Sequence, residues 1–178
     1  MQETRNDDIP WLMTSATAGL IAALGLITPT PRLVWNVSAS APIGLYWIDP
    51  VAAPKLGDLL AIRAPEDIAR LMDARGYLPA NALLLKRAVA LSGTKICRDG
   101  ERVIVAGRVI ALAKSADAQG RRLPVWSGCQ RLADDEIFLV NAEVKDSLDG
   151  RYFGPFPKNS IVGLARPVWT HDESSGRR

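Results

Sequence analysis

The sequence contains a single histidine, and this scarcity excludes more chemistry than any other feature of its composition. His171 lies in the polar C-terminal stretch THDESSGRR. A Ser-His-Asp triad needs an imidazole held in a packed site, which a polar chain end does not provide. Zinc sites usually need several His or Cys ligands, and one histidine with two cysteines is a thin supply. We therefore expect no metal site, no cofactor and, for a hydrolytic reaction, a base other than histidine.

Concentrated charge is also missing. The net charge is only +3 over 178 residues, and no block of five like charges occurs. Nucleic-acid-binding proteins usually carry a basic patch or stripe, so we expect no nucleic-acid partner. Internal repeats and low-complexity tracts are absent from the sequence as well. The length favours one compact domain with appendages, and the 48% of apolar residues is enough for a core.

Charged residues are absent from residues 9–31, which read IPWLMTSATAGLIAALGLITPTP. About 20 apolar residues span the hydrocarbon core of a bilayer, and Trp11 at one edge fits an interfacial position. A cleaved signal peptide fits less well, because the leader MQETRNDD is net negative and the small residues at 38–41 lie far beyond the apolar run. The pattern predicts a single-pass membrane anchor, whose orientation the flanking Arg5 and Arg32 leave open.

This anchor divides the chain into four predicted parts. Residues 1–8 form a short N-terminal tail and residues 9–31 the transmembrane anchor. Residues 32–170 form an extracytoplasmic domain, and residues 171–178 form a disordered polar tail.

Short apolar runs bounded by turn residues predict a mainly β fold for the domain beyond the anchor. Two of these runs, at residues 103–105 and 109–111, flank Ala106-Gly107-Arg108 and predict a hairpin. Further strands are expected at residues 45–48, 58–62, 82–91, 136–140 and 161–169.

One short helix is expected between Pro65 and Arg75. Pro65 suits the first helical position, and the acidic residues that follow it suit the positive end of the helix dipole. Gly76 is a plausible stop. The apolar face of this helix predicts core packing and is formed by Ile68, Leu71 and Met72.

The two cysteines, Cys97 and Cys129, have two interpretations. In an extracytoplasmic domain a lone pair of cysteines favours one disulfide. The alternative is two unpaired buried thiols. We expect the disulfide, which would stabilise the fold by roughly 3–4 kcal/mol in the chain-entropy account.

Lys86 is unusual because it lies within the apolar sequence ALLLKRAVAL. Burial disfavours the ammonium form of a lysine and lowers its pKa, and a neutral amine can serve as a general base near neutral pH. Taken alone, the segment favours a simpler interpretation, in which Lys86 and Arg87 face solvent on an edge strand.

Two further segments carry polar residues in small-residue surroundings. Ser40 lies in SASAPIGLY, where small residues and a Pro-x-Gly sequence predict a tight, exposed backbone that a substrate can approach. Alone, this segment would be a juxtamembrane linker. The third segment, residues 147–155, contains Asp149 and Arg151, which alone would form an ordinary surface ion pair.

Together these segments resemble type I signal peptidases, most closely the conjugative-transfer branch of TraF-type pilin-processing peptidases. The Ser-x-Pro-x-Gly stretch at residues 40–44 resembles that branch's nucleophile box, and Gly-Asp at residues 57–58 is similar to a family strand. Residues 85–93 resemble the Lys-Arg box. Residues 147–154 resemble the Ser-x-Asp-Ser-Arg-Tyr-Phe-Gly box, with Gly150 for the usual Ser. Each box is weak alone, and the resemblance rests on four in order behind an anchor.

The resemblance covers about residues 34–165 and implies catalytic roles. Ser40 would attack the scissile carbonyl, and Lys86 would take its proton and return it to the leaving amine. Ser38 falls two residues before the nucleophile, where bacterial signal peptidases use a hydroxyl as an oxyanion donor. Losing one such donor typically lowers the rate about 100- to 1,000-fold.

The remaining roles support the lysine. Ser147 would hydrogen-bond and orient Lys86, and Asp149, paired with Arg151, would help to fix that site. The fold implied is an all-β peptidase core lying against the membrane surface. The resemblance places this domain on the periplasmic side of the inner membrane, in contact with lipid.

The substrate implied is a membrane-inserted precursor cut after small residues, and in the conjugative branch it is the pilin subunit. Some members of that branch let the pilin's own amino group resolve the acyl-enzyme, so the product is either linear or cyclic. Two alternatives are a general type I signal peptidase and a non-catalytic membrane-anchored scaffold of a secretion machine. A self-cleaving repressor of the Ser-Lys type fits less well, because it would carry a DNA-binding domain where this chain has an apolar span.

Overall fold

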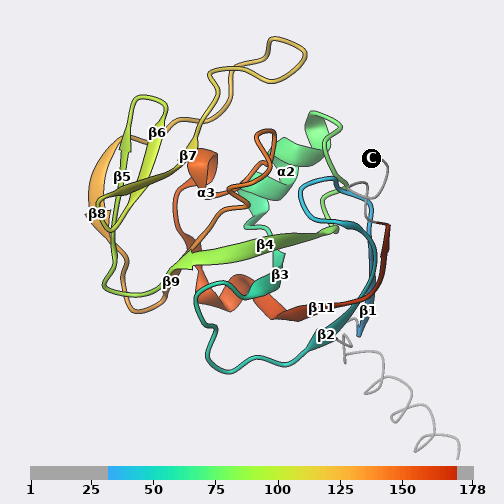
Figure 1. Ribbon diagram of the computed structural model, residues 1–178. Helices are drawn as coiled ribbons and strands as arrows, with labels where there is room; N and C mark the ends of the chain where they lie inside the picture. The colour runs from blue at the N-terminus through green and yellow to red at the C-terminus, as the bar shows by residue number, and fades with distance from the viewer. Residues whose placement is uncertain (1–31, 172–178) are drawn as a thin grey trace, which may run out of the picture. The chain divides into compact units, whose positions relative to one another are not determined.

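Two antiparallel sheets make up residues 32–171, the part of the chain that the computed structural model describes (Figure 1). The predicted tail at residues 1–8 and anchor at residues 9–31 lie outside this part, as do residues 172–178. Within residues 32–171, no helix has the length and apolar character needed to cross a membrane.

The larger sheet has seven strands in the order β1-β2-β11-β3-β4-β9-β10. Its strands are β1 (Leu33–Asn36), β2 (Ile43–Asp49), β3 (Leu59–Arg63), β4 (Leu83–Ala90), β9 (Glu136–Leu139), β10 (Phe156–Pro157) and β11 (Ile161–His171). β3 and β4 are neighbours in its middle, and their apolar side chains pack with those of β9 and of the helix α2 (Glu66–Ala74). A polar side chain on the inner face of these two strands is therefore buried, whereas Arg63 and Arg87 remain exposed.

The smaller sheet has four strands in the order β7-β6-β5-β8 and lies beside the larger one (Figure 1). Its strands are β5 (Lys95–Asp99), β6 (Arg102–Val105), β7 (Arg108–Leu112) and β8 (Gly128–Arg131). Cys97 and Cys129 occupy opposite positions on β5 and β8 and form a disulfide with a Cα–Cα distance of 4.0 Å. The predicted pairing is thus present.

The prediction of a mainly β fold with one short helix is confirmed. α2 follows Pro65, and Gly76 adopts a φ of 68°, which glycine tolerates at a helix end. In the β6–β7 hairpin, Ala106 and Gly107 both have positive φ angles (49° and 82°), as a type I′ turn requires. Two further single turns are α3 (Gly150–Phe153) and the 3₁₀ turn η1 (Lys158–Ser160).

β11 continues to His171, one residue into the segment predicted to be a disordered tail. His171 pairs with Ile43 on β2, and the preceding Thr170 pairs with Gly44. The strands approach so closely here that a Cβ on Gly44 would lie 2.2 Å from the main-chain oxygen of Trp169. The glycine of the Ser-x-Pro-x-Gly stretch therefore lets β11 close over the start of β2.

Candidate active site

Ser40 lies near the tip of the loop that joins β1 to β2, and a buried asparagine gives this loop its shape. The amide nitrogen of Asn36 donates to the main-chain oxygens of Ser38 (2.9 Å), Ala41 (3.0 Å) and Pro42 (3.0 Å). Its amide oxygen accepts from the N–H of Ser38 at 3.1 Å. These four bonds pair main-chain groups of a tight loop that has no partner strand. Ser40 itself is half-buried.

The two serines of this loop are in direct contact. The hydroxyls of Ser38 and Ser40 lie 2.9 Å apart, and the N–H of Ser40 donates to the Ser38 hydroxyl at 3.3 Å. A hydroxyl at position 38 is thus placed beside both the hydroxyl and the N–H of residue 40. Both donor groups suit a developing oxyanion once a substrate carbonyl displaces this mutual contact.

Lys86 is buried, with 2% of its surface exposed, and its Nζ donates to the hydroxyl of Ser147 at 2.9 Å. β4 lies between β3 and β9, so the interpretation of Lys86 and Arg87 as a solvent-facing pair on an edge strand is wrong: only Arg87 is exposed. Burial lowers the pKa of Lys86 to about 8, with a further lowering by Arg151 and an opposing effect from Asp149. A substantial neutral fraction is therefore available at slightly alkaline pH.

Ser40 and Lys86 share one cavity, although they come from different parts of the chain. This cavity measures about 370 Å³, and Ser38, Ser40 and Lys86 line it together with Asp146 and with apolar side chains that include Met72 and Leu148. Within residues 32–171 no hydrogen bond joins Ser40 to Lys86. The fold thus brings the predicted pair to one space without a direct bond between them.

Asp149 and Arg151 form a buried ion pair and not the surface pair that their sequence alone suggests. Arg151 donates from Nε and from a terminal nitrogen to the two carboxylate oxygens of Asp149, both at 2.9 Å, and the two side chains are at most 1% exposed. Asp149 also accepts from the N–H of Arg151 and so caps α3. Ser147, which holds Lys86, directly precedes this structure, so the pair fixes the loop that orients the lysine.

Sequence reasoning missed Asn141, which follows β9 and is 8% exposed. Its amide nitrogen donates to the main-chain oxygens of Ser40 and Leu85, the latter at 3.0 Å. Its amide oxygen accepts from the N–H of Arg87 at 2.9 Å. The available signal was an amide residue directly after the apolar run IFLV, a position where a polar side chain must find partners inside the fold.

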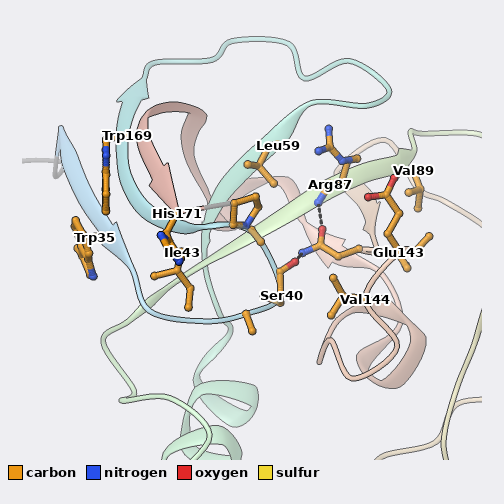
Figure 2. A pocket seen from close by; sticks show the side chains of 16 residues that line it. Trp35, Ser40, Ile43, Leu59, Arg87, Val89, Glu143, Val144, Trp169 and His171 are labelled. Atoms are coloured by element: carbon orange, nitrogen blue, oxygen red, sulfur yellow. Dashed lines mark hydrogen bonds between the residues drawn. The ribbon is translucent and has the colours of Figure 1, made fainter. Parts of the chain in front are cut away.

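A second cavity, of about 480 Å³, also has Ser40 in its wall (Figure 2). Trp35 and Trp169, stacked with ring centroids 5.7 Å apart, form one end of it, and Arg87 and Glu143 line the other end. His171 also lines this cavity, contrary to its predicted place in a polar tail. Ser40 therefore lines both cavities.

Among residues 32–171, no group of three or more His, Cys, Asp or Glu side chains is placed to hold a metal ion.

The family described as signal peptidase, peptidase S26, matches residues 6–170. The chain belongs to this signal peptidase family. The resemblance drawn from the four sequence boxes is thereby confirmed, and it extends to conjugal transfer proteins. A probable conjugal transfer protein TraF of Sinorhizobium fredii is 35% identical over 170 residues, covering 83% of this chain and 89% of that protein.

Other relatives of this S26 peptidase carry similar names. A plasmid transfer protein TraF of Escherichia coli is 30% identical over 170 residues, covering 89% of this chain and 93% of that protein. A conjugal transfer protein TraF of Agrobacterium fabrum is 30% identical over 148 residues, covering 77% and 82%. Among solved structures, a signal peptidase I from Enterococcus faecalis V583 aligns with a TM-score of 0.38 and 15% identity, over 64% of this chain and 97% of that one.

Proposed function

We propose that this S26 peptidase is a serine endopeptidase in which Ser40 is the nucleophile and Lys86 the general base. The observation that carries the proposal is the setting of Lys86. Its amine is buried, its pKa is lowered to about 8, and it lines the same cavity as the hydroxyl of Ser40. A base must reach the proton that it removes and must be unprotonated when it does so.

The hydrogen bond to Ser147 supports this role. A neutral amine has two N–H donors and one lone pair. Donation from Nζ to the Ser147 hydroxyl fixes the amine, and the lone pair remains for the proton of Ser40. Ser40 Oγ then forms a bond to the scissile carbonyl carbon, and its proton moves to Lys86 and from there to the leaving amine. Water, or the pilin's own amino group for a cyclic product, then attacks the acyl carbon; Lys86 takes a proton from this attacking group and returns it to Ser40 Oγ as the ester bond breaks.

Ser38 is proposed as the oxyanion donor, together with the N–H of Ser40. Its hydroxyl lies 2.9 Å from the nucleophile, which places it beside the carbonyl that the nucleophile attacks. Asp149 and Arg151 are proposed to support the site, because they fix the loop that carries Ser147.

The substrate proposed is a membrane-inserted precursor, the pilin subunit of a plasmid-transfer system, released as a linear or cyclic product. Support comes from the relatives, which are described as conjugal or plasmid transfer proteins. We further propose that residues 9–31 anchor the protein once in the inner membrane, with the domain on the periplasmic side. The uncharged run and the Cys97–Cys129 disulfide support this location, since disulfides persist in oxidising compartments.

Cleavage of a purified pilin precursor by the full-length enzyme in detergent, followed by mass spectrometry, tests the proposal. Ser40→Ala should leave no measurable product. Ser38→Ala should retain roughly 0.1–1% of the rate, because one oxyanion donor is lost while the chemistry continues. Ser92→Ala is the matched control: this serine also bonds a lysine, Lys158 at 2.7 Å, but lies away from both cavities and should keep full activity.

Three results would contradict parts of the proposal. Full activity of Ser40→Ala would exclude the nucleophile, and a dead Ser38→Ala with a merely slowed Ser40→Ala would show that the two roles are reversed. Equal cleavage of many unrelated secretory precursors would instead favour a general signal peptidase. If carbonate extracts the protein from membranes, residues 9–31 do not form a transmembrane anchor.

A further inference from the structure

Ser40 and Lys86 are not hydrogen-bonded to each other, so something else must set the distance between them. The serine lies on a loop before β2, and the lysine lies in the middle of β4, which is separated from β2 by two strands, β11 and β3. A proton transfers directly only over hydrogen-bond distance. The contact that joins the loop to β4 therefore decides whether the pair can react.

Asn141 makes that contact with its side-chain amide. The two β4 groups that it bonds, the oxygen of Leu85 and the N–H of Arg87, lie on either side of Lys86 in the chain. The same amide nitrogen donates to the main-chain oxygen of Ser40 (Figure 2, dashed lines beside Ser40 and Arg87). One planar group thus links the residue that carries the nucleophile to both neighbours of the lysine.

The local course of β9 explains why an amide side chain is needed here. β9 pairs with β4 up to Leu139, and the N–H of Val140 still donates to the oxygen of Arg87 at 2.9 Å. Beyond this point the chain turns away, and the oxygen of Leu85 and the N–H of Arg87 would lose their partner strand. The side chain of Asn141 supplies the donor and the acceptor that a continuing strand would have supplied.

The main chain of Asn141 is itself held in place. Its N–H donates to Asp149 at 3.0 Å, and its oxygen accepts from Arg151 at 2.7 Å. These are the two members of the buried ion pair next to Ser147, the serine that bonds Lys86. Asn141 is therefore a fixed point that connects the nucleophile loop, the lysine strand and the loop that orients the lysine.

We propose that Asn141 is a positioning residue that docks the Ser40 loop onto β4 and so holds the serine hydroxyl within reach of Lys86. The inference rests on the proposed Ser40–Lys86 pair and deepens it. Asn141 contacts only the main-chain oxygen of Ser40, and it acts through that residue. Asn36 differs, because the bonds of its side chain lie within the loop and none of them reaches β4.

A thiol in place of the nucleophile measures this docking without any substrate. Both native cysteines are in the disulfide, so Ser40→Cys creates a single free thiol. A lysine ammonium nearby lowers the pKa of a thiol from its ordinary value of about 8.5. The rate of alkylation by iodoacetamide as a function of pH gives that pKa in the folded, full-length protein.

The expected result is a thiol pKa that depends on both Lys86 and Asn141. In the Ser40→Cys background, Lys86→Met should raise the thiol pKa by about 1 unit, to near its ordinary value. Asn141→Ala should raise it by at least half as much, because the thiol moves away from the ammonium. Asn159→Ala, a change of an exposed asparagine in η1, should leave the thiol pKa unchanged.

Kinetics on the enzyme with Ser40 intact provide the second readout. A displacement of about 1 Å in a reacting group can lower the rate 100-fold, so Asn141→Ala should lower kcat about 100-fold. KM should change much less than kcat, because Asn141 is one lining residue of the larger cavity and the apolar walls of both cavities remain. Near-ultraviolet circular dichroism checks the fold, and Asn141→Ser, whose short hydroxyl cannot span Ser40 and β4, replaces the alanine variant if that variant does not fold.

The outcomes distinguish the proposed Ser40–Lys86 pair from the proposed docking role of Asn141. If Lys86→Met raises the thiol pKa and neither Asn141 variant does, the docking role of Asn141 is overturned while the pair stands. If Lys86→Met leaves the thiol pKa unchanged, the proposed Ser40–Lys86 pair fails, and the docking role fails with it. A fall in the melting temperature with unchanged thiol pKa and kcat would assign Asn141 to stability alone.

Discussion

Two successive residues of one loop hold two lysines in opposite ways. On the outer side Asp146 accepts a hydrogen bond from Lys114 at the surface, and on the inner side Ser147 accepts one from Lys86 in the core. The hydrogen bond to Asp146 raises the pKa of Lys114, whereas burial lowers the pKa of Lys86 to about 8. A carboxylate stabilises the ammonium, but a hydroxyl orients the amine and leaves it free to become neutral.

The ion pairs on the two sides differ in the same way. Lys114 and Asp146 are half or more exposed, whereas Arg151 and Asp149 are almost completely buried. Surface pairs are screened by water and contribute little to stability. A buried pair is strongly coupled, since removal of one partner leaves the other charged and without solvent. The inner side of the loop therefore holds the lysine proposed as the base, and it also holds the ion pair whose disruption should lower stability most.

The largest difference between the two sides should appear when each lysine becomes arginine. Lys86→Arg should abolish cleavage, because a guanidinium stays protonated at any working pH and cannot accept the proton of Ser40. Lys114→Arg should keep full activity, since a cation at the surface remains a cation. Single-turnover cleavage of the precursor measures both. Activity in Lys86→Arg would end the case for a lysine base.

The next largest difference concerns stability. Arg151→Met leaves Asp149 charged and buried and should lower the free energy of unfolding by about 3–5 kcal/mol. Lys114→Met breaks the exposed pair and should leave the urea midpoint unchanged. Urea unfolding followed by fluorescence compares the variants. Equal midpoints for Arg151→Met and the unmodified protein would mean that the inner pair is not a supporting element of the site.

Buried and exposed elements also differ in how well the sequence predicted them. The strands with strong apolar runs, β2, β3, β4, β9 and β11, were predicted close to their observed bounds, as were the β6–β7 hairpin and α2. β1, β5, β8 and β10 were not. β8 consists of the exposed residues GCQR, so only its pairing with β5 and the disulfide make it a strand. Such elements are set by tertiary contacts and leave no periodic signal.

The site was predictable only in part, for a similar reason. The order of four sequence boxes led to the prediction of Ser38, Ser40, Lys86 and Ser147 as site residues. The structure places the first three around one cavity and joins Ser147 to Lys86 by a hydrogen bond. The burial of Asp149 and Arg151 was not predictable from their segment alone. Asn141 was missed altogether, because its partners are main-chain groups of residues far away in sequence.

The pH dependence of cleavage should follow the inner lysine alone. Only the neutral amine accepts a proton, so the rate should rise tenfold per pH unit below about pH 8 and level off above it. At pH 6 the rate should be about 100-fold below its plateau. Lys114→Met should move this profile much less than a change at Lys86, because Lys114 does not line the cavity and acts there only through its partner Asp146. A profile that is flat between pH 6 and 9, or that falls with rising pH, would contradict a lysine base.

The smallest expected effect is a gain in stability, and it tests the burial of Lys86 without any reference to activity. The pKa of Lys86 is lowered from 10.5 to about 8, so between these values the unfolded chain binds more protons than the folded one. The resulting penalty on folding, about 3 kcal/mol, is full below about pH 8 and disappears as the pH rises through 10.5. Lys86→Met removes the penalty and loses one hydrogen bond to Ser147, worth about 1 kcal/mol.

The Lys86→Met variant should therefore be more stable than the unmodified protein by about 1–3 kcal/mol at pH 7. The gain should shrink towards zero at pH 10, and Lys114→Met should show no gain at either pH. A gain that persists unchanged at pH 10 would reflect better packing of the methionine rather than the removal of a buried charge.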